Sequence, residues 1–334
     1  MKAIGYKIEG GVEALTDIEL PRPTPGPRDL LVAVKAVSVN PVDTKRRRWE
    51  RPVTPSGHMV LGYDAAGIVE AVGSDVSFFK VGDEVFYAGA MDRPGTNAEF
   101  HLVDERVVGP KPKTLSFAEA AALPLTSITA WEILFDRMKV PYGAKKPCGT
   151  LLVLNGAGGV GSMMVQLATR LTGLTVIATA SRAETIAWVR KLGAEHVANH
   201  NKPINEAIQE IGFDSVDYVA AITTTPGTVP SIVAAMSPQG HITLIDNFDE
   251  GIMPFKAKSI TISWEMMFTR SLFQTADMVA QHRLLSEVSA LVDLGVLRST
   301  LTRNMGRIDA ENLRMAHRAI ESGRTIGKVV LEGF

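Results

Sequence analysis

The sequence predicts an α/β protein in which a β-rich segment precedes a doubly wound parallel sheet. Up to about residue 115, valine-rich runs such as Leu30–Val39 and Ile68–Val72 alternate with Gly, Pro and Asp turns. From about residue 150, apolar runs of strand length alternate with segments of helical length. This alternation is typical of a parallel sheet that carries helices on both faces.

The pattern locates the expected elements of the second half. Expected strands cover 151–155, 175–179, 216–222, 242–246, 259–263 and 327–332, and expected helices cover 160–171, 184–192, 229–236, 274–294 and 311–321. In the first half, Ser116 and Glu119 form a capping-box pattern before an alanine-rich helix, and Pro124 ends it. We therefore expect one domain over 1–125, to which 300–334 returns, and a second over 126–299.

Composition narrows the class of protein. The chain has 334 residues, 46% of them hydrophobic, and a net charge of −1, which favours neither nucleic acid nor an anionic membrane. Its N-terminus reads as a strand rather than a signal peptide, and no apolar run has the length of a membrane span. Cys148 is the single cysteine, so an intramolecular disulfide is excluded. We expect a cytoplasmic protein of enzyme size.

A glycine-rich turn is the strongest functional signal. Gly156, Gly158 and Gly161 have G-x-G-x-x-G spacing between an expected strand and an expected helix. In a dinucleotide-binding turn these glycines permit the tight turn, the approach of the pyrophosphate and the packing of helix on strand. The helix N-terminus then offers N–H groups to the phosphates. The alternative is a purely structural glycine turn.

The end of the next strand indicates which nucleotide binds. NAD-binding folds place a carboxylate about 20 residues after the turn, where it holds the ribose 2′-hydroxyl. Here the expected strand ends in Ser181-Arg182, without a carboxylate. A hydroxyl and a guanidinium suit a 2′-phosphate, so we expect NADPH. The alternative is that Ser181 only caps a helix and Arg182 faces water.

Several motifs follow one another along the chain: Asn40-Pro-Val-Asp43, the glycine-containing run 62–73, Gly82-Asp-Glu-Val85, the run 120–131 and the turn 156–161 with Gln166. Together they resemble the medium-chain dehydrogenase/reductase superfamily, and its quinone oxidoreductase-like branch in particular. They are similar above all to the group called zinc-type alcohol dehydrogenase-like proteins. The resemblance covers essentially the whole chain.

The resemblance implies a GroES-like β-rich domain and a Rossmann domain with the active site in their cleft. It places Asn40 and Thr126 beside the nicotinamide. The mechanism that we expect puts Tyr63 on the substrate side, and the alternative for Tyr63 is a packed aromatic with one hydrogen bond. The implied cofactor-binding residues are Gly156, Gly158, Gly159, Val160, Gly161, Ser181, Arg182, Ile245, Asn247 and Lys328. For Lys328 the alternative is an ordinary exposed lysine.

The sequence argues against the zinc of the alcohol-oxidising relatives. Where the resemblance implies a Cys ligand the chain has Asn40, and where it implies a His-Glu pair the chain has Tyr63-Asp64. Zinc prefers thiolate, imidazole and carboxylate ligands, and one carboxylate does not make a site. His58 and His101 are single histidines nearby in the sequence. We therefore expect no metal.

These features predict an NADPH-dependent reductase of quinones or α,β-unsaturated carbonyls. Hydride addition to an activated double bond puts negative charge on the carbonyl oxygen, and hydroxyl and amide donors can stabilise it. Asn40, Tyr63 and Thr126 supply such donors, whereas we expect Asp64 to be structural and Asp43 to fix its own loop. Two alternatives stay open: a zinc-dependent alcohol dehydrogenase, and a non-catalytic NADPH-binding protein like lens crystallins of similar fold.

Two further segments bear on partners. The basic run 45–51 contains Trp49 and is expected to be a solvated loop rather than a nucleic-acid site, because the net charge is −1. The expected strand 259–263 lies at a sheet edge and can pair with a second subunit, as in similar proteins. We expect a homodimer that acts on a small carbonyl or quinone substrate, with no nucleic-acid or membrane partner.

Overall fold

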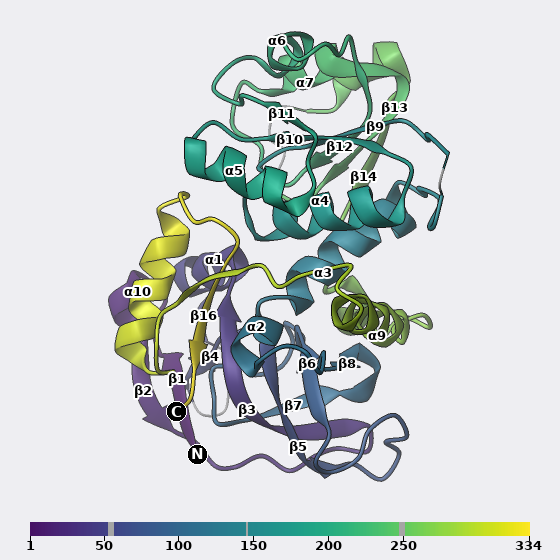
Figure 1. Cartoon of the computed structure of the whole chain (residues 1–334). Coiled ribbons are helices and arrows are strands. Elements are labelled where there is room, and N and C mark those ends of the chain that lie inside the picture. Colours follow the sequence, from purple (N-terminus) through teal and green to yellow (C-terminus); the bar gives the residue numbers. More distant parts are fainter. Residues whose placement is uncertain (53–56, 145, 247–250) are drawn as a thin grey trace. The chain divides into compact units, whose positions relative to one another are not determined.

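The computed structural model describes residues 1–52, 57–144, 146–246 and 251–334, and the chain forms two compact units (Figure 1). The first unit comprises 1–128 and 268–334, and the second comprises 129–267. The chain passes from the first to the second within helix α3 (Pro124–Trp131), which continues as a π-helix over Glu132–Arg137. In the described ranges, no helix is both long and apolar enough to cross a membrane.

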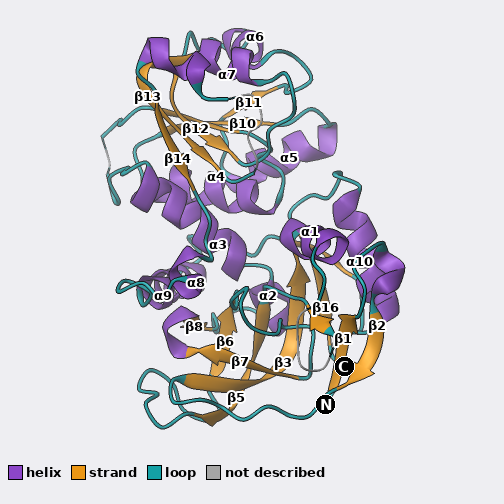
Figure 2. Ribbon diagram, turned by 180° about the vertical axis from the view of Figure 1, so that it is seen from behind, coloured by secondary structure: helices purple, strands orange, loops and turns teal. Residues whose placement is uncertain are grey.

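The first unit is β-rich, as the sequence predicted (Figure 2). One sheet has the order β2-β1-β4, and the other has the order β15-β16-β3-β5-β6-β8 with β7 also paired to β3. Its strands are β1 (Lys2–Tyr6), β2 (Thr16–Glu19), β3 (Asp29–Val39), β4 (Met59–Val60), β5 (Ala65–Val72), β6 (Glu84–Tyr87), β7 (Phe100–Asp104), β8 (Val108–Pro110), β15 (Leu301–Asn304) and β16 (Lys328–Glu332).

Strand β3 is the centre of the larger sheet, and it pairs antiparallel with β5, β7 and β16. In the pairing of β3 with β16, Val39 lies opposite Val329. The end of the chain therefore returns to the first unit, as expected. The helices of this unit are α1 (Pro41–Trp49), α2 (Phe117–Ala121), α8 (Thr269–Leu272), α9 (Ala280–Asp293) and α10 (Ala310–Glu321).

Residues 268–299 group with the first unit, whereas the sequence analysis placed them in the second domain. Helix α9 packs on β8: His282 Nδ1 lies 2.6 Å from the Val108 carbonyl oxygen. The His282 ring also stacks on Phe78, with 4.6 Å between centroids. A helix was expected over 274–294, and α9 covers only Ala280–Asp293 of it. Its partners are tertiary contacts to residues far away in the chain.

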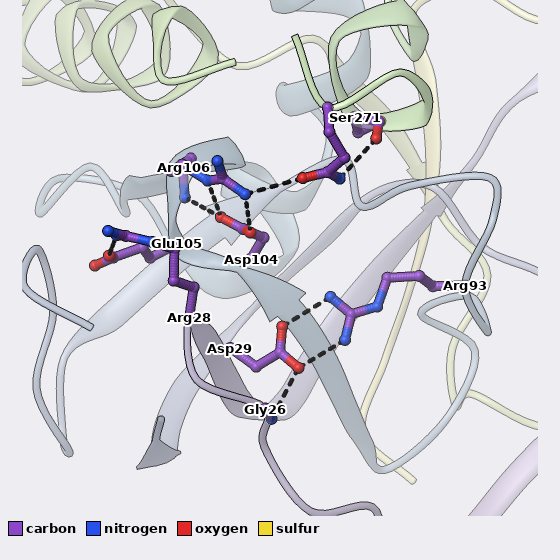
Figure 3. Close-up of polar contacts among 9 residues, drawn as sticks. Gly26, Arg28, Asp29, Arg93, Asp104, Glu105, Arg106 and Ser271 are labelled. Carbon is purple, nitrogen blue, oxygen red and sulfur yellow. Dashed lines mark hydrogen bonds and ion pairs between the residues drawn. The ribbon is translucent and has the colours of Figure 1, made fainter. Parts of the chain in front are cut away.

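Ion pairs hold the loops at the strand ends, and a hydrogen bond from one of these arginines reaches segment 268–299 (Figure 3). Arg93 donates to both carboxylate oxygens of Asp29, each at 2.8 Å. Arg106 makes a similar pair with Asp104 and also donates to Gln274 Oε1 at 3.0 Å. Paired guanidinium–carboxylate contacts hold both partners in a defined orientation.

The basic run 45–51 is helical up to Trp49, so the prediction of a solvated loop was wrong. Arg47 is completely buried: its guanidinium lies 2.9 Å from His317 Nδ1 and pairs with Glu321. Both of these partners lie on α10, so the charge of Arg47 is neutralised inside the unit. Trp49 is 81% exposed, in keeping with a solvated end of the run.

The second unit is a parallel sheet of six strands in the order β11-β10-β9-β12-β13-β14. This order is that of the doubly wound dinucleotide-binding fold. The strands are β9 (Thr150–Val153), β10 (Thr175–Thr179), β11 (His196–Ala198), β12 (Val216–Ala221), β13 (Met236–Leu244) and β14 (Thr261–Trp264). The prediction of a Rossmann-fold sheet is confirmed.

Helices cover both faces of this sheet (Figure 1). One face carries α4 (Gly159–Leu171) and α5 (Ala183–Leu192), and the other carries α6 (Ile204–Gln209) and α7 (Val229–Ala235). Alternate strand residues such as Leu152 and Ile242 pack with Ile208 and Ile232 in one apolar core. Because every strand is parallel, all the carboxyl ends meet at one edge, where such folds bind ligands.

Candidate functional site

The glycine-rich turn connects β9 to α4 at the carboxyl edge of the second unit. Gly158 is the N-cap of α4, and Gly159 and Val160 open the helix, so their N–H groups belong to its first turn. Asn155 precedes the turn with φ of 58°, in the left-handed region. This arrangement points backbone donors and the positive end of the helix dipole toward a bound phosphate.

The close contacts at two glycines explain why no side chain fits there. A Cβ on Gly161 would stand 2.2 Å from the Asn155 carbonyl oxygen, so α4 approaches the strand through bare backbone. A Cβ on Gly156 would stand 2.8 Å from the Ala178 Cβ on β10. At Gly158 the obstacle is the Asn155 side-chain amide at 2.9 Å, which can move. These differences match the separate roles of the glycines in a dinucleotide turn.

Ser181 and Arg182 follow the end of β10, and Arg182 is the N-cap of α5. Arg182 pairs with Glu184 at 3.4 Å across a partly exposed surface. Ser181 Oγ lies 3.0 Å from His200 Nε2, a contact that the sequence analysis did not foresee. A hydroxyl, a guanidinium and an imidazole therefore lie together beyond the ends of β10 and β11.

Ile245 lies directly after β13, at the same edge, and its N–H donates to the Ala221 carbonyl at 3.4 Å. The expected site residue Asn247 lies outside the described residues. The second unit thus brings the glycine turn, Ser181, Arg182 and Ile245 to one edge of its sheet.

A buried polar cluster organises the first unit. The Lys328 ammonium donates to Asp64 Oδ2 at 3.0 Å and to Asn40 Oδ1. The Asn40 amide in turn donates to the same Asp64 oxygen at 2.8 Å. All three residues are at most 3% exposed. The alternative of an exposed Lys328 was therefore wrong, because the ammonium is the internal counterion of Asp64.

Two carboxylates in this region satisfy backbone donors. Asp64 Oδ1 accepts the Leu125 N–H at 2.8 Å. Asp43 accepts the N–H groups of Asn40 and Gly62, at 2.7 and 2.9 Å. Asp43 thus closes its own turn, as expected, and also holds the segment before Tyr63.

Burial sets the protonation of these carboxylates. It raises the pKa of Asp43 to about 7, against the opposing effect of the backbone donors and Lys328. Burial also raises the pKa of Asp64, while Lys328 and Asn40 act in the opposite direction. The Lys328 ammonium is thus the main charge that stabilises a carboxylate at Asp64.

Tyr63 and Thr126 are also buried in the first unit. Arg46 Nη1 donates to the Tyr63 hydroxyl oxygen, and the Tyr63 ring meets Phe268 edge-on at 5.2 Å. Burial raises the pKa of Tyr63, so the phenol keeps its proton. Thr126 Oγ1 donates to the Leu123 carbonyl at 3.0 Å. Sequence reasoning missed Arg46, since no local pattern links it to Tyr63.

These residues do not fit a catalytic zinc. Asp64 is bound to Lys328, and the amide of Asn40 and the hydroxyl of Tyr63 are poor zinc ligands. The ring nitrogens of His101 lie 3.1 Å from the Tyr87 hydroxyl and 2.9 Å from the Pro94 carbonyl oxygen. Across the described ranges, no group of three or more His, Cys, Asp or Glu residues is placed to hold a metal ion.

The fold and the glycine turn define a dinucleotide-binding oxidoreductase fold, and comparison with known proteins gives the family. Residues 26–127 match the family model of the alcohol dehydrogenase GroES-like domain. Residues 159–287 match the model named zinc-binding dehydrogenase. The chain belongs to the medium-chain dehydrogenase/reductase superfamily of oxidoreductases, as the motifs indicated.

Three similar proteins illustrate the range of the family. A zinc-type alcohol dehydrogenase-like protein of Staphylococcus aureus is 42% identical over 99% of both chains. A crystal structure from Rhizobium etli, assigned to the zinc-dependent alcohol dehydrogenases, is 55% identical with a TM-score of 0.95, covering 100% of this chain and 98% of that one. The NADPH-dependent alkenal/one oxidoreductase of Arabidopsis thaliana is 37% identical over 72% of this chain and 64% of its own.

Two glycine substitutions are expected to separate packing from nucleotide binding. Gly161→Ala forces a backbone shift and is expected to lower the free energy of unfolding by about 1–3 kcal/mol. Gly158→Ala displaces only the Asn155 side chain, so stability changes little, but its methyl obstructs a pyrophosphate. Denaturant unfolding and NADPH titration measure the two effects. Equal losses of stability in both variants would contradict this assignment.

Removal of the buried ammonium is expected to destabilise the first unit. Lys328→Met leaves the Asp64 charge buried and unpaired, which typically costs about 3–5 kcal/mol. The double variant Lys328→Met/Asp64→Asn removes both charges and is expected to recover part of that loss. Lys35→Met, at an exposed lysine on β3, is the control. Additive losses in a double-mutant cycle of unfolding free energies would refute the coupling.

Proposed function

We propose that this protein is an NADPH-dependent oxidoreductase that reduces quinones or α,β-unsaturated carbonyls by hydride transfer without catalytic zinc. The observation that carries the proposal is the set of donor groups at the carboxyl edge of the parallel sheet in the second unit. There the glycine turn lies at the N-terminus of α4. The residues after β10 run through Ser181 to Arg182 and include no carboxylate. This donor set suits a pyrophosphate and a 2′-phosphate.

The residues present fit NADPH at this edge. Gly158 leaves room for the pyrophosphate to approach the backbone, whereas Gly156 and Gly161 permit the tight turn and the packing of α4. Gly159 and Val160 supply N–H groups. Ser181 and Arg182 would hold the 2′-phosphate. When bound, the cofactor supplies the hydride, and the protein supplies orientation and electrostatic stabilisation.

Tyr63 of the first unit supplies a donor for a substrate oxygen. Arg46 donates to the Tyr63 hydroxyl oxygen, so the Tyr63 O–H can itself donate a hydrogen bond to a substrate oxygen. The Asn40 amide donates to Asp64 Oδ2 and to the Ser38 carbonyl, and the Thr126 hydroxyl donates to the Leu123 carbonyl, so these donors are engaged within the unit. We propose that Tyr63 stabilises the charge that develops on the substrate oxygen, with Asn40 and Thr126 beside the nicotinamide.

The similarity to the Arabidopsis alkenal/one oxidoreductase supports the enone class and the use of NADPH. The donor set of the first unit argues against a zinc-dependent alcohol dehydrogenase, because Asp64 is paired with the chain's own Lys328 and lies beside an amide and a phenol that are poor zinc ligands. Oxidation of an unactivated alcohol requires a group that lowers the hydroxyl pKa, and these donors do not provide it.

We also propose that the protein forms a homodimer through β14. Among the residues that the structure describes, this strand is the last of the parallel sheet and pairs on one side only, and Trp264 on it is 53% exposed. An exposed edge of this kind can pair with a second copy. Sedimentation velocity is expected to show a dimer that Ile262→Pro weakens. The Glu265 N–H donates to the Leu244 carbonyl on β13, and because alternate residues of a strand face the same neighbour, Ile262 presents its N–H on the outer side of β14. A monomer at micromolar concentration would contradict the proposal.

Turnover in the presence of EDTA tests the function. NADPH oxidation is followed by absorbance across quinones, 2-alkenals and cyclic enones, and we expect at least one class to react in chelator. Tyr63→Phe is expected to lower kcat roughly 100-fold while NADPH binding is kept. Tyr87→Phe, at a buried tyrosine beside His101, is the control. Loss of activity in EDTA that zinc restores, or no reaction with any acceptor despite NADPH binding, would overturn the proposal.

A further inference from the structure

His200 lies beside the residues proposed to bind the 2′-phosphate. Strands β10 and β11 are parallel neighbours, with Thr179 opposite Ala198. Two residues further along each chain segment come Ser181 and His200, so both leave the sheet at the same edge. Ser181 Oγ is 3.0 Å from His200 Nε2, and His200 is exposed to solvent. Nothing in the local sequence marks this histidine, because the contact joins two separate strands.

We propose that His200 is a third contact for the 2′-phosphate of NADPH and makes NADPH affinity, but not NADH affinity, increase as the pH falls. The inference rests on the proposed NADPH site at Ser181 and Arg182. His200 adds an imidazole, which can gain a proton, to the Ser181 hydroxyl and the Arg182 guanidinium, whose charges stay constant near neutral pH.

The surroundings of His200 favour its neutral imidazole in the free protein. Burial and the positive charge of Arg182 lower the pKa of His200, and the Thr179 carbonyl partly opposes them. Glu184, the further charged group next to this cluster, is paired with Arg182 at 3.4 Å. The Ser181 hydroxyl can then donate to the unprotonated Nε2.

A bound 2′-phosphate reverses the sign of the local field. A dianion next to the ring favours the imidazolium, so the pKa of His200 rises on binding and one proton passes from solvent to the ring. Nε2–H then becomes a donor to the phosphate or to Ser181 Oγ. By linkage, a ligand whose binding takes up a proton binds more weakly as the pH rises. NADH carries no 2′-phosphate and leaves His200 unchanged.

The chain offers a matched control for this contact. His241 Nε2 lies 2.8 Å from Ser263 Oγ, so the second unit contains another histidine–serine pair. Burial lowers the pKa of His241 as well. His241 is an internal residue of β13 and does not lie at the carboxyl edge, so its replacement is expected to leave nucleotide binding unchanged.

The test is calorimetric titration of the full chain with adenosine 2′,5′-bisphosphate and with 5′-AMP. Between about pH 7 and pH 8.5 a phosphate monoester is mostly dianionic, so its own titration contributes little. We expect the Kd of the bisphosphate to rise roughly threefold or more over this interval, with little change for 5′-AMP. Buffers of different ionisation enthalpy are expected to report proton uptake for the bisphosphate alone.

Three variants complete the experiment. His200→Gln keeps an N–H donor but cannot titrate, and is expected to abolish both the pH slope and the proton uptake. Arg182→Gln is expected to weaken the bisphosphate at every pH while a pH slope remains. His241→Gln is expected to behave like the wild type.

The outcomes separate this inference from the proposed function. Suppose that the protein prefers the bisphosphate and that Arg182→Gln weakens bisphosphate binding. If the pH dependence of Kd is then the same in His200→Gln as in the wild type, or is absent from the wild type, only the role of His200 is overturned. If the bisphosphate binds no better than 5′-AMP at any pH, the NADPH assignment fails and this inference fails with it.

Discussion

The first unit depends on one buried charge. The ammonium of Lys328 on the terminal strand neutralises Asp64, which orients the Asn40 amide and accepts the Leu125 N–H. A carboxylate buried without a cation would be costly, so the C-terminal strand must return for the unit to be stable. The same ion pair fixes the end of β3, the start of α1, the start of β5 and the start of α3. The Lys328–Asp64 ion pair therefore both stabilises the first unit and orients Asn40, a candidate substrate-site residue.

In the second unit the corresponding constraint is the parallel direction of the strands. Because β10, β11 and β13 end at one edge, the segments after them meet although they are distant in sequence. This edge offers the N-terminus of α4 together with polar residues of the following loops. Nucleotide binding and its proposed pH dependence thus follow from strand order, whereas the donor chemistry of the first unit follows from the burial of charge.

Sequence reasoning succeeded where the signal is local. The strand expected over 175–179 matches β10 at both ends, and the Ser116–Glu119 capping box is present at the start of α2. It failed where tertiary contacts outweigh composition. Three arginines in succession suggested a solvated loop, yet Arg47 is buried against α10. Strand β11 and helix α6 went unnoticed because both are short and interrupted by polar residues.

The sequence by itself determined the class of fold, the glycine turn and the absence of a carboxylate after β10, because each is a pattern of near neighbours. Only the tertiary structure decided that Lys328 is buried against Asp64, that Arg46 reaches Tyr63, that residues 268–299 pack with the first unit and that His200 meets Ser181. These contacts join residues far apart in the chain. Their formation depends on strand pairing and on the pairing of buried charges, which local spacing does not encode.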